Sequence, residues 1–178
     1  MVGYHYPDQL QFERLKTAYL TLDDVHAWSA FFAHPEAIRF LFINTLGLPT
    51  NEAVAHHMIQ KQLERYAEHR YGLQKLVHRE TGEFIGCCGL LLQEVDGQNE
   101  IEVGYHIFQA YWRQGYATEA AKCFIDLAFN ADQTDRVISI IDDENYASIR
   151  VAEKNGLSLY SRTTWMNNEP VAIYRINR

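Results

Sequence analysis

Hydrophobic and polar residues follow two different periods within residues 101–130. Residues 101–108 alternate between apolar and other side chains, which is the pattern of a strand with one buried face. Residues 117–128 place apolar side chains at i, i+3, i+4 and i+7, which predicts an amphipathic helix. Residues 111–117 lie between these patterns and predict a loop that runs straight into the helix. The strand is expected to point Ile101, Val103, Tyr105 and Ile107 to one side and Glu102, Gly104, His106 and Phe108 to the other.

The rest of the chain predicts alternating strands and helices, with no internal repeat or domain boundary. Asp23, Thr50 or Asn51, and Asn145 are placed to cap helices, and Asn155-Gly156 is placed to end one. This order predicts a mixed α/β (α+β) layer architecture in a single domain, residues 1–178. Strands are expected at residues 12–22, 71–79, 84–93, 101–108, 136–141, 157–164 and 170–176, turns at 80–83 and 96–99, and helices after Asp23 and at 36–43, 51–70, 117–130 and 145–155.

The loop before the helix at 117–130 has the chemistry of an anion seat. The first amides of a helix have no partner inside the helix and carry a partial positive charge. Gly115 and Ala117 leave room for a ligand to approach those amides, and Arg113 adds a cation. This combination fits a phosphate or pyrophosphate. An ordinary strand-to-helix turn explains the same residues, because a glycine at the start of a helix is common.

The run EVGYHI followed by YWRQGYATEA resembles the acetyl-CoA-binding core of the GNAT superfamily of N-acetyltransferases, and most closely the branch of the ribosomal-protein N-terminal acetyltransferases. In this family the pattern Gln/Arg-x-x-Gly-x-Gly/Ala wraps the pyrophosphate of CoA with backbone amides. Here Gly115 and Ala117 match, and Trp112 stands at the Gln/Arg position, as it often does in this branch. Arg113 is expected to supply the charge instead. The resemblance implies that the pyrophosphate is held by Trp112, Arg113, Gln114, Gly115, Tyr116, Ala117 and Thr118.

The resemblance also implies a fold and catalytic groups. The GNAT fold is a mostly antiparallel seven-stranded sheet with flanking helices, in which a splayed parallel pair, the fourth and fifth strands, holds CoA. The backbone of Tyr105, His106 and Ile107 is expected to pair with the pantetheine arm, and one amide, near Ile107, is expected to polarise the thioester carbonyl and hold the oxyanion. Glu102 is the candidate general base, because this branch often carries a glutamate beside the acetyl group; a surface or ion-paired glutamate is the alternative. His106 is a second candidate, although a packed or solvated histidine explains it better.

The run ENYASIRVAEKNGL resembles the family's helix beside the pantetheine and the thiol. Asn145 is expected to bind the pantetheine and also to cap its own helix. Ser148 is expected to protonate or solvate the departing thiolate. Many family members place a tyrosine acid just before the Glu-Lys pair, but this chain has Ala152 there, which leaves Ser148 as the acid. Cations that either meet the adenosine phosphates or lie on solvated helix faces are Lys122, Arg150 and Lys154.

Composition narrows the class of protein. A net charge of −7 argues against nucleic-acid binding and suits a cationic amine or basic peptide, although acidity is also an ordinary solubility feature. No apolar run approaches the ~18 residues that span a bilayer, and the N-terminus lacks a basic-then-apolar signal sequence. The adjacent His56-His57 does not form a helical zinc pair, and no metal is expected. The cysteines, which are taken as reduced thiols of a cytoplasmic protein, are Cys87, Cys88 and Cys123.

These residues predict an acetyl-CoA-dependent N-acetyltransferase that moves an acetyl group to a primary amine by direct transfer in a ternary complex. Two acceptors remain open: a protein N-terminal α-amine, which needs an open groove, and a small-molecule amine, which needs a closed pocket. The alternative class is a non-catalytic CoA or acyl-CoA-binding sensor or interaction module, because a phosphate seat does not by itself require chemistry. Exposed sheet edges also allow a homodimer.

Overall fold

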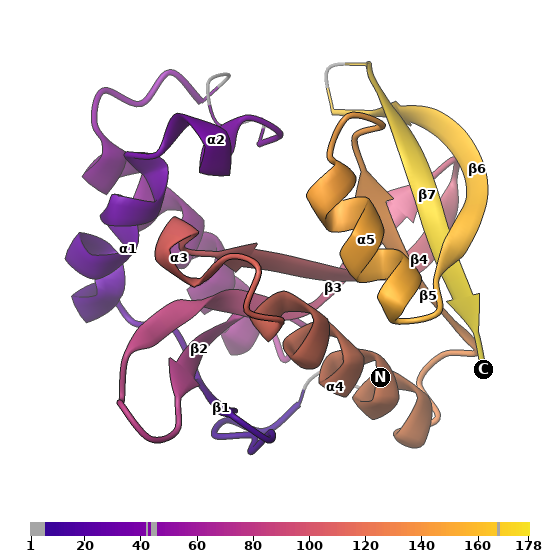
Figure 1. Ribbon diagram of the computed structural model, residues 1–178. Coiled ribbons are helices and arrows are strands. Elements are labelled where there is room, and N and C mark those ends of the chain that lie inside the picture. The colour runs from indigo at the N-terminus through magenta and orange to yellow at the C-terminus, as the bar shows by residue number, and fades with distance from the viewer. Residues whose placement is uncertain (1–5, 42, 44–45, 167) are drawn as a thin grey trace.

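Seven strands form one sheet in the order β1-β2-β3-β4-β5-β7-β6 (Figure 1). All neighbouring strands are antiparallel except β4 and β5, which are parallel. This computed structural model describes residues 6–41, 43, 46–166 and 168–178. The expected mostly antiparallel seven-stranded sheet with one parallel pair is confirmed. The strands are β1 (Leu15–Ala18), β2 (Gln74–His78), β3 (Phe84–Val95), β4 (Gln98–Ile107), β5 (Arg136–Ile141), β6 (Ser158–Trp165) and β7 (Glu169–Asn177).

Helices cover both faces of this sheet. On one face α4 packs against β3 and β4, and α5 packs against β5 and α4. On the other face α1 and α3 pack against each other and against buried side chains of β3. The helices are α1 (Val25–Phe32), α2 (Pro35–Ile38), α3 (Asn51–Ala67), α4 (Tyr116–Asn130) and α5 (Tyr146–Lys154), with short 3-10 helices at η1 (Leu22–Asp24) and η3 (Gln109–Tyr111).

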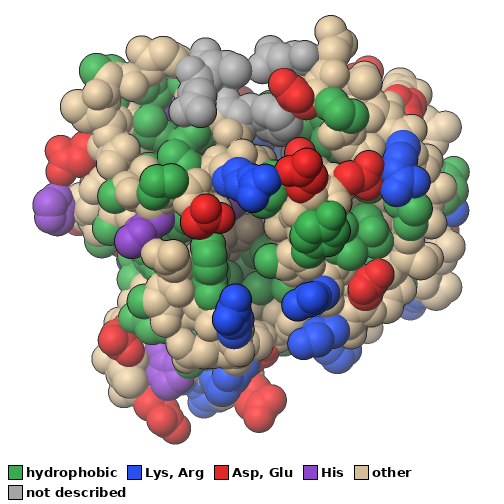
Figure 2. Space-filling model, turned by 45° about the horizontal axis from the view of Figure 1, so that its top comes forward, with side chains coloured by type: hydrophobic (Ala, Val, Ile, Leu, Met, Phe, Trp, Pro, Cys, Tyr) green, Lys and Arg blue, Asp and Glu red, His purple; other side chains and the backbone are tan. Residues whose placement is uncertain are grey.

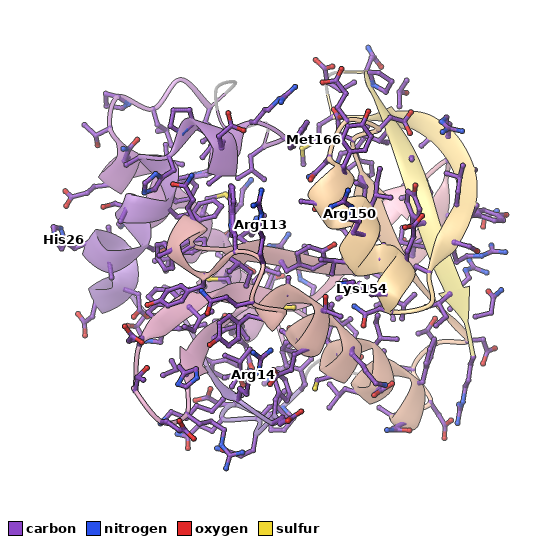
Figure 3. The ribbon with its side chains drawn as sticks, in the orientation of Figure 1. Arg14, His26, Arg113, Arg150, Lys154 and Met166 are labelled. Carbon is purple, nitrogen blue, oxygen red and sulfur yellow. The ribbon has the colours of Figure 1, made fainter. Side chains whose placement is uncertain are left out.

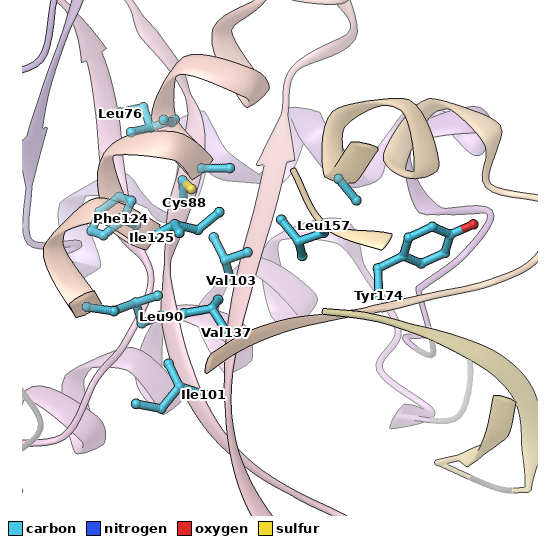
Figure 4. Close-up of a cluster of buried hydrophobic side chains, with 14 of the residues drawn as sticks. Leu76, Cys88, Leu90, Ile101, Val103, Phe124, Ile125, Val137, Leu157 and Tyr174 are labelled. Atoms are coloured by element: carbon cyan, nitrogen blue, oxygen red, sulfur yellow. The ribbon is translucent and has the colours of Figure 1, made fainter. Parts of the chain in front are cut away.

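The apolar side of α4 forms the largest part of the core with the sheet beneath it. Ala120, Ala121 and Phe124 are at most 1% exposed. They pack with Leu90 of β3 and Val103 of β4 (Figure 4). Burying one large apolar side chain stabilises the fold by about 1.5–3 kcal/mol. This packing fixes the start of α4 relative to the end of β4, which is where the predicted anion seat lies.

The sheet opens between its two parallel strands. β3 and β4 pair along a continuous register without a bulge. Among the described residues, β4 and β5 pair at a single position, Glu102 opposite Ile138. Toward Ile107 the two strands diverge. The sheet therefore has two parts, β1 to β4 and β5-β7-β6, whose strands pair at several positions, and the two parts are joined at one bridge.

The first strand is shorter than the sequence predicts. The prediction was a strand over 12–22, whereas β1 covers only Leu15–Ala18. The segment before it folds back on itself, because the N–H groups of Phe12 and Thr17 donate to carbonyls of the same segment. These local bonds use backbone groups that a longer strand would have offered to β2.

Two other predicted elements also differ. The turn expected at 96–99 is tighter, because Asp96 and Gly97 alone join β3 to β4, with φ of +49° and +75°. Such a two-residue turn matches the twist of the flanking strands. The helix expected at 36–43 is α2, Pro35–Ile38, and residue 42 lies outside the described residues.

Gly86 lets β3 approach the backbone of β4 beside the opening. Its φ is +152°, and a Cβ at this position would lie 2.2 Å from the carbonyl oxygen of His106. We expect Gly86→Ala to lower the free energy of unfolding by at least about 3 kcal/mol in urea denaturation, because the obstructing atom belongs to the sheet backbone. Gly97→Ala is the matched control: its φ is +75° and its surroundings are open, so the expected loss is about 1 kcal/mol. Equal losses would contradict this account.

Candidate active site

The loop before α4 turns its backbone amides outward. Gly115 is the N-cap of α4 and has a φ of +83°, a left-handed conformation that glycine adopts without strain. Arg113 is also left-handed, with a φ of +62°. Left-handed residues alternating with right-handed ones form a concave nest of N–H groups that suits an anion. Within the described part of the chain, no acceptor is bonded to the N–H groups of Gly115, Tyr116, Ala117 and Thr118.

Cations gather around this loop although the chain is acidic overall. Arg113 is exposed and has no ion-pair partner among the described residues. Figure 3 shows its side chain extending into the space between the α1–α2 side of the molecule and α5, which carries Arg150 and Lys154. Figure 2 shows Lys and Arg side chains beside a hollow near the middle of this face. The local charge is therefore suited to an anionic ligand.

Three loop side chains hold the loop in shape. Trp112 Nε1 donates to the carbonyl oxygen of Ile107 at 2.7 Å. Trp112, which stands at the Gln/Arg position of the Gln/Arg-x-x-Gly-x-Gly/Ala pattern, therefore holds the loop against the end of β4. Gln114 Nε2 donates to the carbonyl of Ala110 at 3.0 Å. The side chain of Tyr116 is buried, so only its backbone faces outward.

The backbone of β4 presents its hydrogen-bonding groups alternately to β3 and to β5. The N–H of Phe108 donates to the carbonyl of Ile85 on β3 at 3.0 Å, one position beyond the pair of Ile107 with Gly86. By alternation the backbone groups of Tyr105 and Ile107 point the other way, where β5 has diverged. The backbone of His106 faces β3 and is not available to a ligand between β4 and β5. The opening thus exposes the backbone groups of Tyr105 and the N–H of Ile107, whose carbonyl already accepts from Trp112 Nε1.

Glu102 lies at the bridge where β4 and β5 separate. Burial raises its pKa from the ordinary 4.5 to about 6, against a lowering by the Gln93 side chain, the Ile140 backbone amide and the charge of Arg65. The hydrogen bond from Gln93 Nε2 to the Glu102 carboxylate is 2.7 Å long. Part of the Glu102 side chain is still exposed, so it can exchange a proton with a ligand or with water. A carboxyl group whose pKa lies near the working pH is suited to accept a proton.

His106 lies on the same face of β4 as Glu102, about 13 Å farther along the strand. Its ring packs near those of Trp28 and Phe31, with centroid separations of 6.4 and 5.8 Å. Burial lowers its pKa to about 4, so the imidazole is neutral at pH 7. These surroundings favour a packed histidine over a second base.

The residues predicted on α5 lie beside the same opening. The side-chain oxygen of Asn145 accepts the N–H of Ser148 at 3.1 Å and caps the helix. The hydroxyl of Tyr105 donates to the carbonyl of Ser148 at 3.1 Å, which ties α5 to β4 across the gap. The amide nitrogen of Asn145 has no hydrogen-bond partner among the residues that the structure describes, so capping and ligand binding are compatible.

An ion pair connects the two sides of the molecule near this opening. Arg39 follows α2, Glu144 precedes α5, and their charged atoms lie 2.8 Å apart. The side chains are 54% and 68% exposed, so the pair contributes at most about 1 kcal/mol. The connection can therefore be broken at little cost.

Residues 14–158 match the acetyltransferase (GNAT) domain. The chain belongs to the GNAT acetyltransferase family. This membership confirms the expectation of an N-acetyltransferase, and the acetyl donor of the family is acetyl-CoA.

Relatives of this GNAT chain are similar over different lengths. YkkB of Bacillus subtilis (strain 168) is 44% identical over 96 residues, which cover 54% of this chain and 55% of YkkB; the chain thus spans about half of that relative. YoaA of the same organism, named an N-acetyltransferase, is 30% identical over 151 residues, covering 83% and 81%. The solved structure of RimL, a ribosomal alpha-N-protein acetyltransferase in complex with coenzyme A, has a TM-score of 0.77 at 14% identity, covering 96% of this chain and 98% of RimL. At 14% identity, this similarity shows a shared fold and no more.

Three polar residues around the GNAT site were not among the sequence candidates. Gln93 on β3 and Arg65 on α3 lie near Glu102, and Arg14 contacts the loop before α4. Gln93 could have been found, because pairing β3 with β4 places it diagonally across from Glu102. Arg65 and Arg14 reach the site from distant segments, which no local pattern indicates.

A second hollow, of about 400 Å³, lies away from the opening, between the ends of α4, α5 and β7. Lys122 and Lys154 line it. Lys122 pairs with Asp126 at 2.8 Å, which favours a solvated helix face for this lysine. No helix in the described ranges is long and apolar enough to cross a membrane, and no group of three or more potential ligands there could hold a metal ion.

The pKa of Glu102 predicts a measurable effect on stability. Because the folded pKa of about 6 exceeds 4.5, the folded state binds the proton more tightly, and this contribution is lost as pH rises through 6. Relative to wild type, Glu102→Gln should gain about 2 kcal/mol in unfolding free energy between pH 4 and pH 8. Urea denaturation at both pH values checks this, with the exposed Glu94→Gln as control. A gain no larger than the control's would contradict the burial of the Glu102 charge.

Proposed function

We propose that this GNAT enzyme moves an acetyl group from acetyl-CoA to a primary amine by direct transfer in a ternary complex. The observation that carries the proposal is the opening between β4 and β5, with outward amides at its wide end and the Glu102 carboxylate at its narrow end. Direct transfer requires the two substrates to meet in a fixed geometry. The carboxylate faces the α1–α3 side and the amide seat lies at α4, so donor and acceptor can approach from different sides.

The donor is held by backbone groups more than by side chains. The nest before α4 binds the pyrophosphate, with Arg113 as its cation. The pantetheine arm lies along β4 and pairs with the backbone of Tyr105 and the N–H of Ile107, as part of an added strand would. The free amide nitrogen of Asn145 meets the pantetheine from α5. The residues assigned to the pyrophosphate remain Trp112, Arg113, Gln114, Gly115, Tyr116, Ala117 and Thr118, of which Trp112, Gln114 and Tyr116 use their side chains within the protein.

The chemistry needs a neutral amine and a stabilised oxyanion. Glu102 takes a proton from the ammonium directly or through water, and the amine nitrogen then bonds to the thioester carbon. The Tyr105 amide is the better oxyanion donor, because it lies about 10 Å along β4 from Glu102, against about 16 Å for Ile107. As the carbon–sulfur bond breaks, the nitrogen loses its second proton and the thiolate leaves toward α5, where Ser148 donates a hydrogen bond or passes that proton on to the sulfur. A hydroxyl is a weak acid, so its contribution is modest.

For the acceptor, the α-amine of a protein N-terminus is the better candidate. A peptide needs an open groove. Among the described residues, one ion pair spans this side, Arg39 to Glu144, and it is exposed and weak. The name of RimL and the resemblance to its branch point the same way. The aromatic wall of Trp28 and Phe31 instead favours a small amine if that ion pair stays closed.

Binding of acetyl-CoA is the first test. We expect wild type to bind acetyl-CoA in calorimetric titration and Gly115→Glu to lose binding, because a carboxylate then occupies the pyrophosphate seat. Gly97→Glu is the matched control, since Gly97 also has a positive φ but lies in the β3–β4 turn; a Cβ meets nothing within 4 Å at Gly97 and only Arg14 Nη2, at 3.4 Å, at Gly115. Circular dichroism checks that all three proteins are folded. Absence of binding by folded wild type would refute the proposal.

Turnover tests the catalytic role of Glu102. Against a panel of N-terminal peptides and small amines, we expect Glu102→Gln to lower kcat by about 10²-fold. Its affinity for acetyl-CoA should stay unchanged, and the wild-type rate should fall below pH 6 as the carboxylate takes up a proton. Free thiol release is the readout, and the best acceptor in the panel separates the two amine classes.

A non-catalytic binder would behave differently in the same assay. It would hold acetyl-CoA with either residue at position 102 and release no thiol with any amine. Wild-type turnover that Glu102→Gln leaves intact would instead retain the enzyme and assign the base to another group.

A further inference from the structure

Arg14 joins two segments that are far apart in the sequence. Its Nη1 donates to the carbonyl of Gln114 at 2.9 Å. Its Nε and its backbone N–H donate to the two carboxylate oxygens of Glu119, at 2.7 and 2.8 Å. The guanidinium also lies 4.4 Å from the ring centre of Tyr116. Figure 3 shows Arg14 and Arg113 on opposite sides of the start of α4.

The bond to Gln114 fixes the direction of a particular amide. The peptide between Gln114 and Gly115 is planar and trans, so its C=O and N–H point in opposite directions. Because Arg14 holds the carbonyl, the N–H of Gly115 points away from Arg14, toward the exposed side of the loop. A charged donor on the carbonyl also polarises the peptide and makes the N–H a stronger donor.

Nothing else in the described structure fixes this peptide so directly. Gly115 is left-handed, and no side chain caps the helix there. Glycine has the widest choice of backbone conformations, so an unsupported Gly115 would sample other directions. The amide nest therefore depends on a contact from outside the 112–117 pattern.

The contact with Glu119 has a second consequence. Glu119 lies in the first turn of α4, and its side chain is only 12% exposed. An uncompensated carboxylate there would repel a phosphate bound at the same helix end. Arg14 compensates this charge with two donors, which leaves the partial positive charge of the helix available to the ligand.

We propose that Arg14 is a positioning residue for the donor's pyrophosphate. It directs the Gly115 amide through the Gln114 carbonyl and neutralises Glu119, without itself touching the ligand. The inference rests on the proposed function, since it takes acetyl-CoA as the ligand of this loop.

Kinetics with two different acetyl donors distinguish a positioning role of Arg14 from a general structural role. Acetyl-CoA carries the pyrophosphate, whereas S-acetylpantetheine has the same thioester without it. For Arg14→Ala we expect the KM for acetyl-CoA to rise at least about tenfold, with kcat unchanged. The kcat/KM for S-acetylpantetheine should stay at the wild-type value. Equal losses with both donors would show a merely structural role and overturn the inference.

Arg79→Ala is the matched control. Its Nη1 donates to the carbonyls of Phe12 and Glu13, so it anchors the same segment as Arg14, and none of its described contacts reaches the loop. We expect it to leave the ratio of the two donors unchanged. Equal shifts in the Arg79 and Arg14 variants would overturn the inference.

A milder variant keeps the test decisive if Arg14→Ala does not fold. Arg14→Lys keeps the charge but cannot reach Gln114 and Glu119 with one ammonium group, so we expect a smaller rise in the KM for acetyl-CoA alone. In nitrogen–proton spectra of the ligand-free protein, the Gly115 amide signal should shift in both variants.

Folded wild type that does not bind acetyl-CoA would overturn the proposed function together with this inference. Wild-type binding that neither Arg14 variant changes would overturn the inference alone.

Discussion

The parallel ladder between β4 and β5 ends after one paired position, and the rest of the site depends on this interruption. Side chains bridge the strands where the backbone no longer does. Ser139 Oγ donates to the carbonyl of Val103 at 3.3 Å, and the Tyr105 hydroxyl reaches Ser148 on α5. The width of the gap is therefore set by side chains, and it exceeds the roughly 4.8 Å between paired strands. Backbone groups of a central strand, which a sheet normally consumes, become available to a ligand.

The two faces of the sheet differ in chemistry at this point. The α4–α5 face carries outward amides and cations, whereas the α1–α3 face carries the Glu102 carboxylate and a wall of aromatic rings. A net charge of −7 would not by itself suggest a site for an anion. The helix start and a few cations overcome it locally, because screening limits the influence of distant charges at physiological ionic strength to about 8 Å.

Much of the fold could be predicted from the sequence, because its pattern is local. The change of period in residues 101–130 predicted a strand, loop and helix, and the structure has β4, Gly115 and α4 there. The short β1 was missed, because the bonds that fold residues 10–17 back leave no mark on the hydrophobic period. Arg14 and Arg65 were not predicted for a related reason. Each contacts or influences a residue more than thirty positions away in the sequence, and neither belongs to a sequence motif. The roles of Glu102, Ser148 and Asn145 remain predictions.

The same interruption leaves the two parts of the sheet joined by few backbone hydrogen bonds. Each neighbouring pair of strands from β1 to β4, and from β5 through β7 to β6, shares several paired positions, whereas β4 and β5 share one bridge; packing of α4 and α5 and one buried cluster also join the two parts. Backbone amides near the bridge should therefore exchange with solvent through small openings of the sheet, while those inside each ladder exchange only through larger unfolding. A ligand bonded to β4 in this gap would supply hydrogen bonds that β5 does not make, so its binding is expected to slow the exchange of the amides beside the bridge.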